Sequence, residues 1–500
     1  MSKDAEKRSL DSGEFLFRFR NTKALLDNSQ SGGFEELEKQ SIYFAQPEAL
    51  NDPVEGLSDA FWDGDKVLWE NLFRHYALSL VRYASEWLLV TGEEIERAKV
   101  GALRTEMDLP SDTLRNIYRE FNSDFSAAIE SEQLAIVLGR RTVPLRRERL
   151  TNLLFLIHQT ALSHLFRVLK RHRMSKLEVP MPAGSEISAK AVVNSWEGIA
   201  VAPQTIEMPA EHQLEIMARI GNLMNHQLEL GMMSRHEDKD RARKLVALFA
   251  RFPEAYVDAF LRDLHFTPWR VACFSRRCVN ASMWGTYGNE HRGAALVFRT
   301  EQRDAKRFFR VQGMLGTGGS GVELEVRSVT YRKQPPPLDS FLEISTLPME
   351  KLERTWMKSD SGEPSVRLQE MTRDIDAWRK AHWEKAFERA TWKHPDWAHE
   401  DEQRLIATTP FSDDPAPQPL TYEFSQLEGI VFGMRMSVEE KLRIVTVVEK
   451  KCRDEGRADF RFFQAYYSPL KGEMDIAELN LLKFEQCPRA DLDNDASGGA

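Results

Sequence analysis

The strongest constraint on the fold is a change in the spacing of apolar residues near residue 65. Before it, Phe15 to Arg20 alternates apolar and basic residues, which is the two-residue period of a strand. From about residue 65 to 264 the period becomes three to four, as in the stripe Leu150, Leu153, Leu154, Ile157, Ala161, Leu165, Val168 and Leu169. Strand-like patterns return at Trp269 to Ser275. The chain is therefore expected to be an α+β protein whose small mixed sheet is interrupted by a large all-helical insertion.

These patterns divide the chain into four parts. We expect the first part of the α+β core at 14–62, the helical insertion at 63–264, the second part of the core at 265–480 and a disordered tail at 481–500. The turn Asn51-Asp52-Pro53 closes the first part, because a residue that precedes proline is driven out of the helical region.

Composition predicts that the chain has no transmembrane helix. Charged residues make up 29% of the chain, and the apolar run Leu153 to Ile157 ends at His158, far short of the roughly 20 apolar residues that cross a bilayer. The polar N-terminus lacks the apolar stretch of a secretory signal. We therefore expect a cytoplasmic protein.

Positive charge is concentrated between residues 139 and 176, where ten basic residues stand against one acidic residue in a chain of net charge −9. The candidate partner-binding residues are Arg140, Arg141, Arg146 and Arg147, because guanidinium groups bind phosphates through forked hydrogen bonds. Such a segment could contact a nucleic acid or a protein. The alternative is that these charges are two solvated helix ends, with the cations favoured near a C-terminus.

Two other patterns do not predict a binding site. The glycine-rich segment 313–321 lacks the Gly-Lys-Ser/Thr ending of a phosphate-binding loop and favours a hairpin tip. His394, Asp396, His399 and Glu400 lack the helical pair of histidines found in zinc peptidases, and the four cysteines form no zinc-binding spacing, so no metal site is expected.

The sharpest motif is Trp397-x-x-Glu400-x-Glu402-x-Arg404. If Gln403 to Thr408 is a strand that begins near Glu402, then Glu402 and Arg404 share one face and Glu400 lies just before it. A carboxylate beside an arginine stays ionised, and it can stabilise a developing cation or accept a proton. The alternative is an ordinary surface ion pair.

Four motifs, taken in order, resemble a widespread bacterial family catalogued as a domain of unknown function. Leu16 to Arg20 resembles its Leu-Tyr-Lys-Tyr-Arg strand, and Phe44 to Pro53 resembles its Phe-Ser-x-Pro-x-x-Phe-Asn-Asp-Pro phrase, although Leu50 replaces an aromatic residue. The third is Cys-Phe-Ser, followed by Met-Trp-x-x-Tyr and His-x-Gly, which match Cys273 to Ser275, Met283 to Tyr287 and His291 to Gly293. The fourth is Trp-x-x-Glu-x-Glu-x-Arg, which matches Trp397 to Arg404. The resemblance covers 14–62 and roughly 269–470 and leaves out the helical insertion.

The order of these motifs is also similar to that in ADP-ribosyltransferases, which cleave NAD. That similarity implies an NAD-dependent enzyme, such as a toxin or defence effector that modifies nucleic acid or protein. Glu402 would stabilise the ribose cation that forms when nicotinamide leaves, with Glu400 as its competitor and Arg404 as an orienting charge. Arg18 or Arg20 would hold the pyrophosphate, and Trp284 or Tyr287 would stack on nicotinamide. The cofactor-binding set implied is Arg18, Arg20, Asn51, Asp52, Ser275, Trp284, Tyr287 and His291.

Two alternatives remain open from the sequence. The same pocket could recognise a nucleotide or peptide without catalysis, with the insertion docking a partner. Asp52, Glu400 and Glu402 could instead surround a divalent cation in a hydrolase or nuclease.

Overall fold

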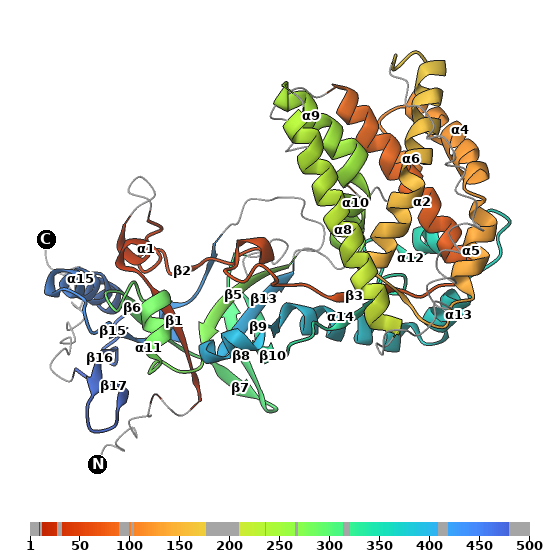
Figure 1. The fold of residues 1–500 in the computed structure, drawn as a ribbon. Coiled ribbons are helices and arrows are strands. Elements are labelled where there is room, and N and C mark those ends of the chain that lie inside the picture. The colour runs from red at the N-terminus through yellow and green to blue at the C-terminus, as the bar shows by residue number, and fades with distance from the viewer. Residues whose placement is uncertain are drawn as a thin grey trace, which may run out of the picture. The chain divides into compact units, whose positions relative to one another are not determined.

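The computed structural model forms two compact units, which are described separately below. It describes residues 10, 13–27, 33–89, 100–101, 105–176, 210–235, 237–265, 269–313, 321–408 and 419–479. Unit 1 comprises 1–57, 268–335 and 387–500, and unit 2 comprises 58–267 and 336–386 (Figure 1). The expected tail at 481–500 and most of the glycine-rich segment 313–321 lie outside the described residues.

Unit 1 contains a mixed sheet of ten strands in the order β17-β16-β15-β6-β1-β5-β13-β9-β8-β7. Strands β15 and β16 are parallel, and every other neighbouring pair is antiparallel. The mixture of helix and sheet is therefore confirmed, in a larger sheet than expected. The strands are β1 (Phe15–Arg20), β5 (Trp269–Ser275), β6 (Ala294–Arg299), β7 (Glu301–Arg303), β8 (Lys306–Val311), β9 (Val322–Ser328), β13 (Glu402–Thr408), β15 (Leu427–Phe432), β16 (Arg461–Ser468) and β17 (Glu473–Glu478).

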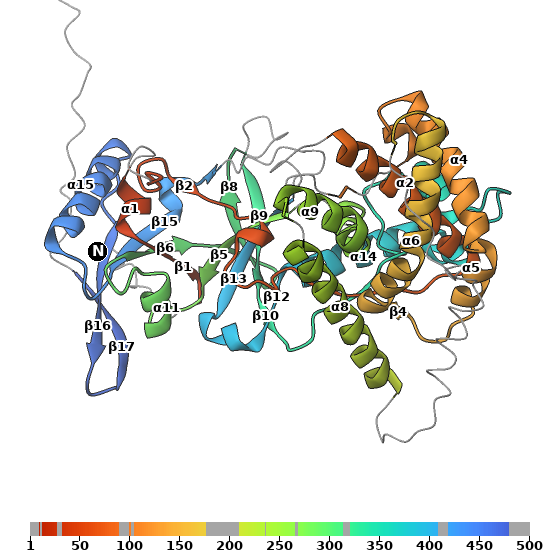
Figure 2. The same cartoon turned by 45° about the horizontal axis from the view of Figure 1, so that its top comes forward.

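Strand register decides which residues share a face of this sheet. Phe17 pairs with Ser275, and Ser275 pairs with Glu402, so these three side chains point to one side. Arg404, opposite Cys273, lies on that side as well. Side chains alternate along a strand, so Arg18 and Arg20 point to the other side. Figure 2 shows β6, β1, β5 and β13 next to one another.

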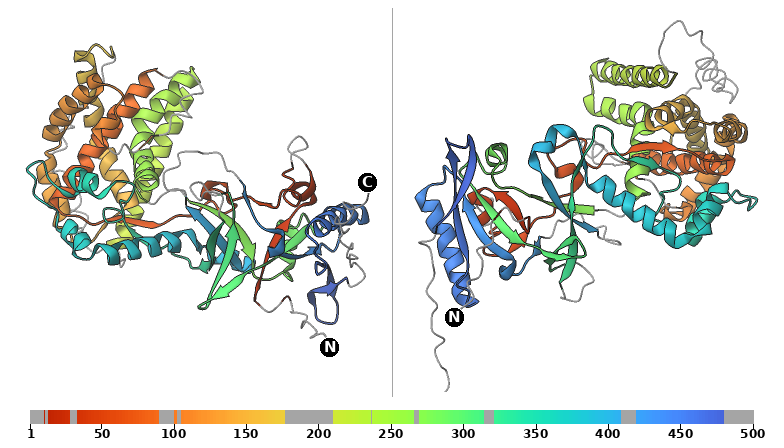
Figure 3. Two further views of the ribbon diagram at one scale, coloured as in Figure 1. Left: turned by 180° about the vertical axis from the view of Figure 1, so that it is seen from behind. Right: turned by 90° about the horizontal axis from the view of Figure 1, so that it is seen from below.

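Each face of the sheet carries its own helix. Helix α11 (Ala281–Thr286) places Trp284 against Phe19 on the face that holds Glu402. On the opposite face, Ile444 and Val448 of α15 (Val438–Asp454) pack in the cluster that contains Leu16 and Phe432. Figure 3 shows α15 running along the strands at this end of the sheet. Smaller elements of unit 1 are α1 (Thr22–Leu26), β2 (Ser41–Ile42), β10 (Thr330–Tyr331), β12 (Trp392–Lys393) and β14 (Leu420–Thr421).

Unit 2 is mainly helical. The stripe predicted between Leu150 and Leu169 is confirmed, because all eight of its residues are buried in one core on helix α6 (Arg147–Arg171). The other helices are α2 (Lys66–Leu89), α4 (Asp112–Ala128), α5 (Ser131–Gly139), α8 (Ala210–Arg235), α9 (Lys239–Val246), α10 (Phe252–Asp263), α12 (Met349–Leu352) and α13 (Val366–Arg373). Helix α14 (Ile375–Ala390) belongs to unit 2 up to residue 386.

The division of the chain differs from the expected one at residues 336–386. The sequence pattern assigned them to the second part of the α+β core, whereas the structure places them in unit 2. Strand β11 (Pro337–Asp339) pairs with β3 (Asp59–Trp62), whose other neighbour is β4 (Leu145–Arg146). Phe341 and Trp356 then fill the helical core. These are long-range contacts, which local periodicity does not report.

Within the described ranges, each helix is too short or too polar to cross a membrane.

Candidate functional site

Five charged residues of unit 1 meet in its interior, and we call Glu55, Lys393, Glu400, Glu402 and Arg404 the ion cluster. The side chain of each is at most 4% exposed. Glu55 follows the Asn51-Asp52-Pro53 turn, Lys393 ends β12, and Glu400 ends the short 3₁₀ helix Pro395–Glu400. Glu402 and Arg404 both lie on β13. The motif that the sequence singled out thus lies in a buried network.

Glu402 and Arg404 form its most rigid pair. Arg404 donates from Nε to Oε1 of Glu402 at 2.8 Å and from Nη2 to Oε2 at 2.9 Å, and Lys393 Nζ donates to Oε2 at 3.1 Å. Burial on its own raises the pKa of Glu402, but the charges of Arg404 and Lys393 outweigh it and hold that pKa at about 2. Both oxygens of this carboxylate are therefore occupied, and it stays ionised.

Glu400 connects the ion cluster to the surface. Its Oε2 accepts from Lys393 Nζ at 2.6 Å, and its Oε1 accepts from the hydroxyl of Tyr287 at 2.6 Å. The same hydroxyl accepts a hydrogen bond from the exposed amide of Asn51. Burial and the bond to Glu400 raise the pKa of Tyr287, so its hydroxyl stays protonated. A line of hydrogen bonds thus runs from exposed Asn51 through half-buried Tyr287 to Glu400.

The backbone around the cluster is fixed by neighbouring side chains. Ser275 Oγ donates to the carbonyl of Glu400 at 2.9 Å, and the amide of Glu402 donates to the hydroxyl of Tyr331 at 2.9 Å. The ammonium of Lys393 lies 4.9 Å from the ring centre of Trp397. Ser275 is therefore a supporting residue of the motif, and Trp397 packs against the cation that joins the two glutamates.

The two arginines predicted to hold a pyrophosphate lie on the opposite face of the sheet from Glu402. Arg18 is buried and donates to the carbonyl of Tyr43 at 3.1 Å. Arg20 donates from Nε to Glu36 at 2.7 Å and forms a second, forked contact with it. The structure does not bring either guanidinium to the ion cluster.

Three other predicted cofactor-binding residues form hydrogen bonds within the protein. Trp284 is fully buried and donates from Nε1 to the carbonyl of Cys278 at 2.8 Å, so its ring is packed within the protein. Asp52 is buried and accepts from the amide of Val54 at 3.1 Å. His291 has φ of +68°, and its carbonyl accepts from the amide of Arg435 at 2.8 Å. Of the predicted set, Ser275 and Tyr287 contact Glu400 of the ion cluster, and Asn51 is linked to it through Tyr287.

Several charges of the basic segment 139–176 have acidic partners inside unit 2. Arg146 pairs with Asp59, and Arg147 pairs with Asp258. Arg171 at the end of α6 binds Glu120 and Asp124. Arg140 is exposed and Arg141 is half-buried. Three of the ten basic residues counted in the sequence, Arg146, Arg147 and Arg171, are therefore paired with carboxylates.

Lys393 and Glu55 belong to the site and were missed from the sequence. Lys393 lies four residues before Trp397, outside the spacing of the motif, and Glu55 lies more than 330 residues away in the chain. A lysine in Trp392-Lys393 carries a weak signal, because a short buried strand seldom contains a lysine without a partner. No comparable signal marks Glu55, which comes next to Arg404 through the tertiary fold alone.

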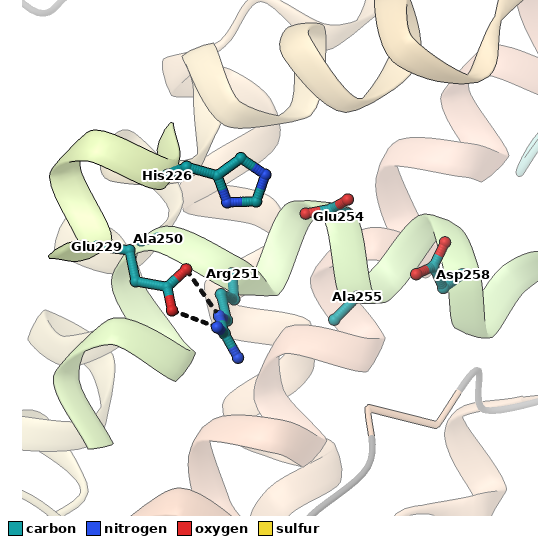
Figure 4. A pocket seen from close by; sticks show the side chains of 7 residues that line it. All are labelled: His226, Glu229, Ala250, Arg251, Glu254, Ala255 and Asp258. Carbon is teal, nitrogen blue, oxygen red and sulfur yellow. Dashed lines mark hydrogen bonds and ion pairs between the residues drawn. The ribbon is translucent and has the colours of Figure 1, made fainter. Parts of the chain in front are cut away.

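Two surface cavities lie apart from the ion cluster. One in unit 2, of about 250 Å³, is lined by His226, Glu229, Ala250, Arg251, Glu254, Ala255 and Asp258. Figure 4 shows Glu229 of α8 ion-paired with Arg251 beside this cavity. The other, in unit 1, of about 230 Å³, is lined by Arg299, Thr300, Glu301, Phe308, Arg310, Glu323, Ser425 and Gln426. Among the described residues, no three His, Cys, Asp or Glu side chains are grouped so as to hold a metal ion.

Comparison with known proteins gives one match. Residues 283–405 match the family model described as protein of unknown function (DUF2971). This range begins at Met283 and ends one residue after Arg404, so it contains Tyr287, Lys393 and both motif glutamates, while Asn51 and Glu55 precede it. Among curated proteins and solved structures, none matches the chain.

Proposed function

We propose that unit 1 is an ADP-ribosyltransferase-like enzyme that binds NAD and breaks the bond between nicotinamide and ribose. The observation that carries the proposal is the hydrogen bond of 2.6 Å from Tyr287 to Glu400. It joins a half-buried aromatic ring to a carboxylate one step below the surface. An aromatic ring suits the flat face of nicotinamide, and a carboxylate suits the cationic ribose that remains after nicotinamide leaves.

Glu400 fits the catalytic role better than Glu402. Both oxygens of Glu402 are held by Arg404, and Lys393 adds a further bond. Glu400 instead shares one oxygen with Lys393 and the other with a tyrosine hydroxyl that also contacts exposed Asn51. A substrate whose nicotinamide stacks on the ring of Tyr287 would meet Glu400 first, because the hydroxyl of that ring is bonded to Glu400. Glu402 and Arg404 then serve as the fixed support on which Lys393 and Glu400 are placed.

The reaction in this proposal is a substitution at the first carbon of ribose. The bond from that carbon to the ring nitrogen of nicotinamide breaks, and its electron pair leaves with nicotinamide. Glu400 stabilises the positive charge that develops on the sugar, as carboxylates do in glycoside cleavage. The oxygen of water or of an acceptor forms the new bond and releases its proton to solvent. The acceptor would be a nucleic acid or a protein that contacts exposed Arg140 and the basic segment, as in a defence effector.

The order of elements supports the same proposal. The basic strand β1 and the late strand β13 lie in one sheet, with β5 between them. Tyr287 follows helix α11, which packs on the face of this sheet that holds Glu402.

The test is release of nicotinamide from NAD by the full chain. We expect Glu400→Gln to abolish release and to retain the wild-type circular dichroism spectrum. Glu428→Gln is the matched control, because Glu428 is also buried in unit 1 and ion-paired, to Arg299, but lies outside the ion cluster. Equal release by wild type and Glu400→Gln, or no release by wild type with nucleic acid and protein acceptors present, would count against the enzyme.

A second candidate function is a binding module that recognises a nucleotide or peptide without catalysis. It is favoured by the burial of all five charged side chains, which form ion pairs with one another as in a structural scaffold. Calorimetric binding of NAD that leaves the nicotinamide bond intact would support this module over the enzyme. A metal-dependent hydrolase is less well supported, because the ammonium of Lys393 already occupies the space between Glu400 and Glu402.

A further inference from the structure

The ion cluster contains three carboxyl groups and two cations. Lys393 Nζ lies 2.6 Å from Glu400, 3.1 Å from Glu402 and 3.8 Å from Glu55. Arg404 lies 2.6 Å from Glu55 and binds Glu402 through two hydrogen bonds. With all groups ionised, this buried set carries a net charge of −1. An uncompensated charge in a protein interior is costly, and the usual relief is uptake of one proton by an acid.

Glu55 is the acid with the poorest contacts. Its carboxyl group is buried, and its Oε1 forms an ion pair of 2.6 Å with Nη1 of Arg404, but neither oxygen has a hydrogen bond of good geometry from the described residues. The same nitrogen also donates to the carbonyl of Ala390 at 2.7 Å. Glu400 and Glu402, by contrast, each accept hydrogen bonds on both oxygens.

We propose that the ion cluster binds one proton at neutral pH and that Glu55 carries it. Protonation makes the cluster neutral, with two carboxylates facing two cations. Protonated Glu55 also holds the segment from Asn51 to Gly56 against Arg404 of strand β13 without a buried excess charge. Loss of the proton leaves the charge of −1 and weakens this attachment, so that the segment bearing Asn51 is released as pH rises. The proposal does not rest on NAD chemistry.

The surroundings of Glu55 agree with this assignment. Burial raises the pKa of Glu55 above 4.5, and the charge of Glu402 raises it further. Arg404 and Lys393 lower it, but their effect is smaller. The other charged groups of its surroundings are Glu400, across Lys393, Asp52 in the same turn, and Arg389, which donates to the carbonyl of Gly56 at 2.6 Å. A raised folded-state pKa means that the stabilisation is complete below 4.5 and is lost as pH rises through the folded value.

The experiment compares urea unfolding of the full chain and of Glu55→Gln, which mimics the protonated acid, over roughly pH 5 to 8. We expect wild type to lose stability relative to Glu55→Gln as pH rises, so that the variant is the more stable of the two at the alkaline end. Glu36→Gln is the matched control, because Glu36 is a buried glutamate of unit 1 with an arginine of its own, Arg20. Its curve should stay parallel to that of wild type. Parallel curves for wild type and Glu55→Gln would overturn the proposal.

A second variant, Glu400→Gln, tests the number of charges in the cluster, and it remains informative if Glu55→Gln does not fold. In Glu400→Gln the cluster keeps two carboxylates and two cations, so Glu55 should ionise and the pH dependence should disappear. The position of the proton is read from carbon NMR of side-chain carboxyl-labelled glutamate. In wild type at neutral pH one glutamate resonance should have the shift of a protonated acid, and in Glu400→Gln that resonance should have the shift of a carboxylate. A wild-type spectrum at neutral pH without a protonated glutamate, or one in which that resonance is unchanged in Glu400→Gln, would overturn the proposal. These readouts leave the NAD assay independent.

Discussion

Glu402 and Arg404, two residues apart on strand β13, form a forked ion pair with hydrogen bonds of 2.8 and 2.9 Å in the interior of unit 1. Both side chains point to the same face, and Lys393 extends the pair to Glu400. Glu402 and Arg404, which the sequence suggested as catalytic, therefore support the positions of the other charged residues. Glu400 is the glutamate whose hydrogen bonds lead towards solvent, through Tyr287. Separating these two roles gives predictions with different readouts.

The first prediction concerns acid stability. The pKa of Glu402 is about 2 in the folded protein and 4.5 without its partners, so its stabilisation is present above 4.5 and is lost as pH falls towards 2. The difference is worth about 3 kcal/mol of unfolding free energy. Glu402→Gln should cost roughly 3–5 kcal/mol near neutral pH, because it also removes the forked partner of buried Arg404 and leaves only Glu55 paired with it among the described residues. Urea unfolding of the variant should show less dependence on pH below 4.5 than wild type, and an equal dependence would contradict this account.

The second prediction concerns the link between Tyr287 and Glu400. Tyr287→Phe keeps the ring and removes the hydroxyl that bonds to Glu400 and Asn51. A hydrogen bond to a charged group is worth about 1.5–3 kcal/mol, so nicotinamide release should fall tenfold or more if the hydroxyl positions the carboxylate. Tyr466→Phe is the control, since this exposed tyrosine bonds to Asp475 on the β16–β17 hairpin. Identical rates for the two variants would show that the hydroxyl has no part in the reaction.

The sequence predicted those features that depend on local periodicity. The three-to-four spacing from Leu150 to Leu169 describes one helix whose stripe is buried, because such a stripe has no stable position other than against a core. Strand β13 begins at Glu402, one residue before the predicted start at Gln403, and this places Glu402 and Arg404 on one face. The number of strands in the sheet and the transfer of 336–386 to unit 2 depend on pairing between distant segments.

The site was predicted in part for the same reason. The motif located Glu400, Glu402 and Arg404, but the alternation of Phe17-Arg18-Phe19-Arg20 also settles that both arginines leave the face of Phe17, which is the face of Glu402. That consequence follows only when the register of β1, β5 and β13 is known. Glu55 could not be predicted, since its place beside Arg404 is set by the path of the chain after Pro53.

The last prediction concerns unit 2, where His158 is buried among helices. Its Nδ1 lies 2.8 Å from the hydroxyl of Tyr76, and its Nε2 lies 2.7 Å from the carbonyl of Leu248. A carbonyl only accepts, so Nε2 carries the hydrogen and Nδ1 accepts from tyrosine. Leu248 belongs to the π-helical turn Ala247–Arg251, and π-helical turns disturb the regular pairing of carbonyls, so the imidazole supplies a donor at this point.

Burial lowers the pKa of His158 to about 4, from 6.5, although the bond to Leu248 opposes it. A depressed pKa means that the neutral ring stabilises unit 2 above 6.5 and that this stability is lost as pH falls towards 4, by about 3 kcal/mol. His158→Gln should lower stability at neutral pH and remove this dependence, as measured by urea unfolding followed through tryptophan fluorescence. His172→Gln, at the end of α6 beside Glu120, should keep the dependence of wild type. If His158→Gln still loses stability as pH falls from 6.5 to 4, another group of unit 2 is responsible. The neutral ring of His158 is then not what makes unit 2 sensitive to acid.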